Sequence, residues 1–163
     1  MEKKRPYLPT LFDRLLDDEP KQLHEAYDVC FYDARTMRRL VQRDIAAILN
    51  NTNIEDRLEE KRDAPALESV VNYGVAAMTG KFGSSDNWAL MEKRIRSALL
   101  RFEPRLIPES LLVRLLTGKD EPSRGGLILF EIRALIYWDP NPIDLCVNGV
   151  YDRETEHIAL SAS

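Results

Sequence analysis

Glu103 and Arg105 lie on either side of Pro104, between two apolar runs in the stretch LLRFEPRL that covers residues 99–106. A carboxyl group beside apolar residues can act as the general acid of a glycosidase, so cleavage of peptidoglycan by Glu103 is one candidate function. Arg105 opposes it, because a neighbouring cation favours the ionised carboxylate, and sequence spacing marks out no second carboxylate. The alternative is structural, since proline fixes a corner from which two opposite charges leave in set directions.

Other patterns that support catalysis or ligand binding are absent from the sequence. The two histidines, His24 and His157, belong to no zinc-binding motif of the H-E-x-x-H kind, and there is no G-x-S-x-G elbow for a nucleophilic serine. Cys30 and Cys146 lie far apart and outside any C-x-x-C motif, so we expect buried thiols rather than a disulfide or a zinc site. The sequence therefore predicts no catalytic residue, no cofactor and no metal.

Composition and charge limit the class of protein further. The 163 residues are 44% hydrophobic, which predicts one domain with a core. A net charge of −4, from 23 basic and 27 acidic residues, offers no broad cationic surface for nucleic acid. The first residues contain no apolar stretch of signal-peptide length, and the longest apolar run carries Glu131 and Arg133. We therefore expect a cytoplasmic protein that inserts no segment directly into a membrane.

The segment after Pro9 predicts a short amphipathic helix. Its apolar face consists of Leu11, Phe12, Leu15 and Leu16, with Thr10 as the candidate N-cap. Because this face precedes the predicted core, two alternatives stay open. Residues 1–20 form a docking segment for another protein, or the helix packs on the domain that we assign to residues 21–163.

Two longer helices are predicted, one from about Asp33 to Asn50 and one that follows the candidate N-caps Ser85 and Asp86 and ends before Pro104. The apolar residues at helical spacing are Met37, Leu40, Val41, Ile45, Ile48 and Leu49 in the first, and Trp88, Met91, Ile95, Ala98, Leu99 and Phe102 in the second. We expect the basic side of the second helix, made by Lys93, Arg94, Arg96 and Arg101, to be solvated. Residues 52–65 are dense in charge and predict a solvated connector with one helical turn.

After Pro104 the pattern changes to the alternation of β-strands, over residues 111–116, 127–138, 143–151 and 157–160. In the longest segment one side is shared by Ile128, Phe130, Ile132, Ala134, Ile136 and Trp138. N-terminal helices followed by an antiparallel β-meander, packed against the long helix, predict an α+β fold. We expect a sheet edge within residues 143–160, where a strand of another protein could pair with His157, Ile158, Ala159 and Leu160.

Four motifs point to one family. They are LFDRLL at residues 11–16, RDIAAILN at 43–50, SVVNYG at 69–74 and FEPRL at 102–106. Together they resemble the baseplate-wedge proteins of contractile injection machines, in particular the TssE family of type VI secretion baseplate subunits, which is related to a phage wedge protein once labelled lysozyme-like. The resemblance covers most of the chain.

The resemblance implies a non-enzymatic structural subunit in a membrane-docked baseplate. Such a subunit binds the larger wedge subunits and presents a platform on which the contractile sheath, whose subunits are joined by donated strands, begins to assemble. It also implies that Glu103, Pro104 and Arg105 hold the wedge together. From the residues alone a second role stays open for the corner, in which Arg105 caps carbonyl groups at the end of its own helix.

Overall fold

The computed structural model describes residues 10–15, 20–21, 32–59, 61–77, 87–116 and 126–162. The helices are α1 (Leu11–Leu15), α2 (Ala34–Leu49), α3 (Ala64–Leu67) and α4 (Asn87–Phe102), and the strands are β1 (Thr52–Asn53), β2 (Val75–Ala76), β3 (Leu112–Leu115), β4 (Leu127–Ile136), β5 (Ile143–Asp152) and β6 (His157–Ala162). Short 3-10 turns lie at Glu55–Arg57, Val70–Asn72 and Pro108–Ser110.

The helix α2 forms where the sequence predicts it. The carboxylate of Asp33 accepts a hydrogen bond from the Thr36 backbone N–H at 2.7 Å and caps the first turn, and Asn50 caps the last. All six apolar residues of the predicted face are buried. In α4 the predicted face is buried in the same way at Met91, Ile95 and Leu99. The helix ends at Phe102 because Pro104 disfavours helical geometry in the residue before it.

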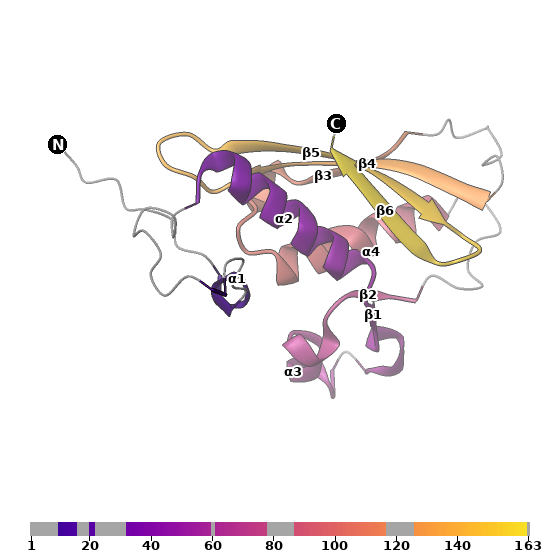
Figure 1. The fold of residues 1–163 in the computed structure, drawn as a ribbon. Coiled ribbons are helices and arrows are strands. Elements are labelled where there is room, and N and C mark those ends of the chain that lie inside the picture. Colours follow the sequence, from indigo (N-terminus) through magenta and orange to yellow (C-terminus); the bar gives the residue numbers. More distant parts are fainter. Residues whose placement is uncertain are drawn as a thin grey trace.

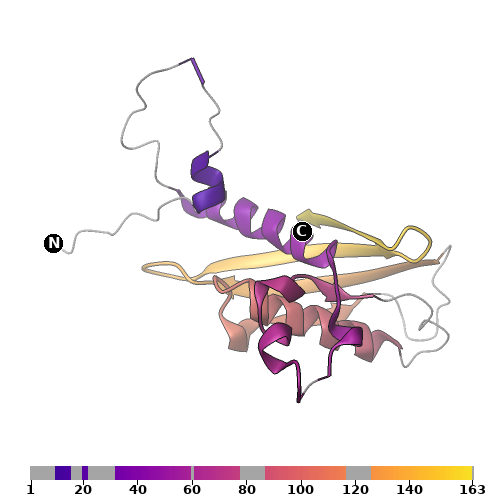
Figure 2. The ribbon, with the colours of Figure 1, turned by 90° about the horizontal axis from the view of Figure 1, so that it is seen from below.

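The four-stranded sheet is antiparallel, with the strand order β3-β4-β5-β6. Both long helices lie against the same face of the sheet (Figures 1 and 2), α2 beneath β5 and β6, and α4 against β3. The sheet face that points to the helices includes Phe130, Ile132 and Ile136, all fully buried. The predicted α+β fold and the predicted inward side of the longest strand are therefore confirmed.

The described residues of the connector after α2, 50–59 and 61–77, are more ordered than predicted. β1 and β2 pair in parallel, and α3 lies between them in the chain. The prediction of a solvated basic side on α4 is wrong for its three arginines, since Arg96 donates to the Leu111 carbonyl and the other two bind residues of the connector. Arg94 donates to the Ala77 carbonyl and pairs with Asp56, and Arg101 pairs with Glu55. These acidic residues of the connector are held against α4, so the charges on both segments fix the connector in place.

The connector returns to the core through a tight turn at Gly74, which has a φ of +111°. The turn lies against the end of α2, and the Val75 backbone N–H donates to the Asn51 carbonyl at 2.8 Å. Tyr73 packs on Phe102, with ring centroids 5.2 Å apart. Glycine suits this turn because a positive φ of this size is one that residues with a Cβ rarely adopt.

Candidate functional site

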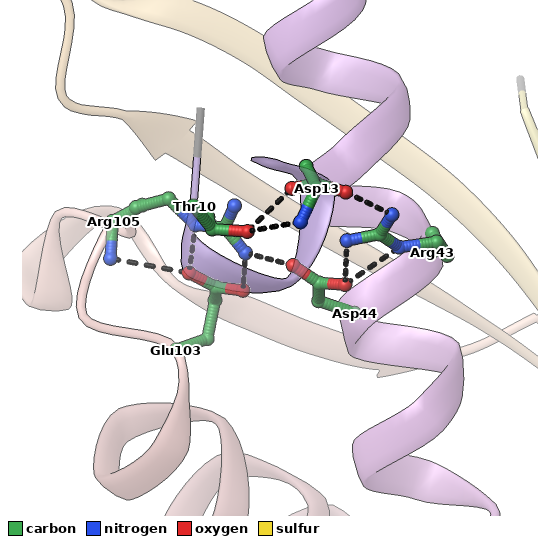
Figure 3. A network of polar contacts seen from close by, with 6 residues as sticks. All are labelled: Thr10, Asp13, Arg43, Asp44, Glu103 and Arg105. Carbon is green, nitrogen blue, oxygen red and sulfur yellow. Dashed lines mark hydrogen bonds and ion pairs between the residues drawn. The ribbon is translucent and has the colours of Figure 1, made fainter. Parts of the chain in front are cut away.

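The Glu103–Arg105 corner is closed within the chain (Figure 3). Arg105 Nε donates to Glu103 Oε1 at 2.7 Å, and a terminal guanidinium nitrogen donates to Glu103 Oε2 at 2.6 Å. The Arg105 backbone N–H adds a third bond to the same carboxylate. Glu103 is only 2% exposed, whereas Pro104 between the two charges is exposed. The corner therefore joins a buried ion pair to the protein surface.

The corner is extended by residues of α2 and α1. Arg105 also donates to Asp44 at 2.6 Å, and Asp44 in turn binds Arg43 at 2.8 Å. Arg43 reaches Asp13 of α1 at 2.5 Å, and the pKa of Asp13 lies below its ordinary value, chiefly because of this bond. Sequence reasoning missed these partners, because Asp44 lies 61 residues from Arg105 in the chain. The motif RDIAAILN contains Arg43 and Asp44 and is the feature of the sequence that could have identified these partners.

The guanidinium of Arg105 has one incomplete side. Its second terminal nitrogen is buried and has no hydrogen-bond partner among the described residues. Burial acts to lower the pKa of Arg105, but the bonds to Glu103 and Asp44 outweigh it and raise the pKa above its ordinary value. Arg105 is therefore positively charged, and one of its own buried nitrogens has no acceptor among the described residues.

This geometry does not favour acid catalysis by Glu103. Both oxygens of its carboxylate accept hydrogen bonds, from a fork of two guanidinium N–H groups and from one backbone N–H, so they are already engaged within the chain. Asp44, the second carboxylate of the corner, shares the same guanidinium. The corner is suited to hold segments together rather than to transfer a proton. Among the described residues no cluster of histidine, cysteine and carboxylate groups could hold a metal ion.

The apolar face of α1 is exposed. Leu11 and Leu15 keep 73% and 74% of their surface in solvent, and Phe12 keeps 62%. The helix is held to α2 by the Asp13–Arg43 ion pair and by the Arg43 guanidinium, which lies 5.7 Å from the Phe12 ring centroid. Thr10 accepts from the Asp13 backbone N–H, as predicted for an N-cap, and the predicted Leu16 lies outside the described residues.

The sheet has two edges, β3 and β6. The prediction of an edge over residues 143–160 is therefore too broad, since β5 (Ile143–Asp152) lies between β4 and β6. The prediction is right for His157–Leu160, which lie in β6, and the exposed His157 is an ordinary surface histidine. Sequence reasoning missed the edge role of β3, because alternation identifies a strand but not its place in the sheet.

A second charged cluster lies on the sheet face away from the helices. Glu131 on β4 accepts from Arg114 at 2.5 Å and pairs with Arg133 at 2.9 Å. The Cys146 thiol donates to the same carboxylate at 3.4 Å. Cys146 is half-buried on this face rather than buried in the core as predicted, and Cys30 lies outside the described residues.

Glu131 makes part of the stability depend on pH. Hydrogen bonds from Arg133 hold its pKa below the ordinary value of 4.5 against the opposing effect of burial, and Arg114 and Cys146 lower it further. Because the pKa is lower in the folded state, the stabilisation is complete above pH 4.5 and is lost as the pH falls through the folded value. Glu131→Gln should therefore lose less stability than the wild type between pH 6 and pH 3, in urea unfolding at each pH. Parallel curves for the two proteins would contradict this account.

The sequence matches one protein family, described as baseplate wedge protein gp25, over residues 35–141. The matched region covers more than half of the chain and contains α4, β3, β4 and all of α2 except its first residue. The chain belongs to the baseplate wedge protein gp25 family. The predicted resemblance to baseplate-wedge proteins is thereby confirmed. No significant match is found among curated proteins or among solved structures.

The gp25 family match includes Asp44, Glu103 and Arg105 but not α1, β5 or β6. The buried part of the corner thus lies within the family region, and the Asp13 extension lies outside it. Membership in the gp25 family gives the chain a structural role in a baseplate. In the part of the chain that the structure describes, no helix is long and apolar enough to cross a membrane.

Proposed function

We propose that this protein is a non-enzymatic subunit of a type VI secretion baseplate wedge, which binds the larger wedge subunits and provides a platform for assembly of the contractile sheath. The observation that carries the proposal is the position of the Glu103–Arg105 corner inside the region that matches the gp25 family. In this role the protein works in the cytoplasm, in a membrane-docked baseplate, and binds no nucleic acid.

The corner is the proposed contact with the larger wedge subunits. Pro104 is exposed and Glu103 is buried beside it, so a partner that covers the corner would also seal the ion pair from water. The side chain of Arg105, which is 23% exposed, is the part of the ion pair that a partner could reach. The internal bonds to Glu103 and Asp44 fix the orientation of the guanidinium beside the exposed Pro104.

Two further contacts complete the proposal. Residues 1–20 act as a docking segment for another baseplate component, and residues 21–163 form the wedge domain. The exposed Leu11, Phe12 and Leu15 support the docking alternative over packing on the chain itself, because exposed apolar residues on one helix face are typical of an interaction surface. At the other end of the chain, the edge strand β6 is the proposed acceptor for a strand of a sheath subunit.

Co-purification with the co-expressed larger wedge subunits tests the corner. Arg105→Lys keeps the positive charge but loses the planar fork that binds Glu103 and Asp44, so we expect loss of the complex. Arg43→Lys makes the same chemical change on a neighbouring residue that is 40% exposed and binds Asp13 and Asp44, and it should leave the complex intact. Both variants should first be shown to be folded by circular dichroism and thermal unfolding.

The results separate the possible roles. If both variants co-purify as the wild type does, the corner is an internal brace and not the wedge contact. If the wild type never co-purifies with wedge subunits, the proposed function itself is wrong.

A further inference from the structure

Asn50, at the end of α2, takes the place of a neighbouring strand at one point of β6. The Ile158 backbone N–H donates to Asn50 Oδ1 at 2.9 Å, and Asn50 Nδ2 donates to the Ile158 carbonyl at 2.9 Å. Asn50 Nδ2 also donates to the Ala46 carbonyl at 2.9 Å, which fixes the amide to the last turn of the helix. One side chain thus makes both backbone bonds that an added strand would make to Ile158.

These two bonds define which residues of β6 face outward. In an antiparallel ladder, consecutive residues point their N–H and C=O groups alternately to one neighbour and then to the other. Ile158, opposite Tyr151 of β5, points away from β5, and by the same alternation Leu160 and Ala162 also point away. Within the described residues no hydrogen bond reaches the outward backbone groups of Leu160. The edge is therefore closed at Ile158 and open at Leu160.

We propose that Asn50 is a stop on the β6 edge, which restricts an added strand to Leu160 and Ala162 and so sets its register. This inference rests on the proposed function, in which the edge accepts an extended segment of a sheath subunit. To pair with Ile158, the incoming strand would have to displace both bonds between Asn50 and Ile158, which would leave Asn50 Oδ1 without its donor. Because a shift of one residue moves every side chain to the opposite face, a fixed starting point selects one register.

The stop also shortens the edge that could pair with a wrong strand. Exposed edge strands are protected in many sheets by charges, bulges or covering side chains. At the opposite edge, Arg96 of α4 donates to the Leu111 carbonyl just before β3 begins. One polar side chain from each long helix therefore binds the backbone at a sheet edge. Of the two, only Asn50 binds both the N–H and the carbonyl of a strand residue.

Amide hydrogen exchange, measured by NMR on the full chain, tests the stop directly. In the wild type the Ile158 amide should exchange about tenfold more slowly than the Leu160 amide, since only the former is hydrogen-bonded. Asn50→Ala should remove this difference. The matched control is Asn51→Ala, because Asn51 donates to the Ala47 carbonyl at 2.7 Å in the same manner but has no bond to β6. It should leave both amides unchanged.

The design allows for loss of stability. Exchange of the β4 amides in the same spectra reports global unfolding. The variant Asn50→Asp keeps an acceptor for the Ile158 N–H. This variant should preserve slow exchange at Ile158 even if Asn50→Ala is too unstable to measure. The proposal is wrong if the Ile158 and Leu160 amides are equally protected in the wild type. It is also wrong if Asn50→Ala leaves exchange of the Ile158 amide unchanged while the β4 amides stay protected.

Exchange in the complex with co-expressed sheath subunits, read after quenching and dissociation, separates the stop from the proposed function. We expect the Leu160 amide to become protected, while the protection of Ile158 still depends on Asn50. If Ile158 is protected in the Asn50→Ala complex as well as in the wild type, the added strand extends past Asn50 and the stop is wrong. If Leu160 stays unprotected in the complex, strand addition to β6 is wrong, even where the isolated chain shows the closed Ile158.

Discussion

Arg105→Ala should lower the free energy of unfolding by about 3 to 5 kcal/mol, the usual cost of removing one partner of a buried ion pair. The side chain of Glu103 is 1% exposed and its carboxylate is held mainly by this guanidinium, which Asp44 shares. The substitution therefore leaves a buried charge without its cation and removes the link between α4 and α2. Urea unfolding followed by circular dichroism measures the loss.

Arg62→Ala is the control for this prediction. Arg62 pairs with Glu59 and Asp63, but its side chain is 68% exposed, and exposed ion pairs of this kind contribute roughly 0 to 1 kcal/mol. If Arg105→Ala costs no more than Arg62→Ala, the corner does not stabilise the fold, and its charges serve only the proposed contact with the wedge subunits.

Gly74→Ala should cost about 3 kcal/mol, from backbone strain and overpacking together. A Cβ atom at this position would lie 2.1 Å from the Asn51 carbonyl oxygen, and neither group can move without separating β1 from β2. The φ of +111° adds strain, because residues with a Cβ rarely adopt it. Thermal unfolding of the variant should show the loss, and the amide of Val75 should lose protection.

Gly126→Ala measures the cost of backbone strain without the steric clash that an added Cβ makes at Gly74. Gly126 also has a positive φ, of +78°, but an added Cβ would meet only the Arg153 Cβ, at 3.9 Å. We expect it to cost about 1 kcal/mol, as for strain alone. Equal costs for the two variants would show that the carbonyl contact at Gly74 is relieved by a small shift of the chain.

The sequence predicts best the elements whose pattern is long. α2, α4 and β4 each repeat their apolar residues over several turns or pairs, and the structure buries the predicted faces. β1 and β2 have two residues each, which is too short for any period, and their pairing depends on where Gly74 turns the chain. The ordered connector was missed for this reason.

The candidate site could be predicted only in part. The pattern around Pro104 identifies a corner with two charges, but burial of Glu103 and the pairing of Arg105 with Asp44 depend on how α2 packs beside α4. Sequence spacing carries no information about partners 61 residues apart. The same holds for Asn50 and Ile158, which are separated by 108 residues and meet only when the sheet is complete.

The long separation in sequence between Asn50 and Ile158 affects how the chain folds during synthesis. Each strand of the large sheet pairs with the next one in the chain, so the sheet can grow as it leaves the ribosome. The first long helix packs beneath the strands made last, where Ile158 is 2% exposed. Until β6 emerges, the apolar face of that helix is covered only by α4 and β5. The nascent protein therefore exposes part of this apolar face to chaperone binding and aggregation until β6 is made, and docking of β6 ends this exposure.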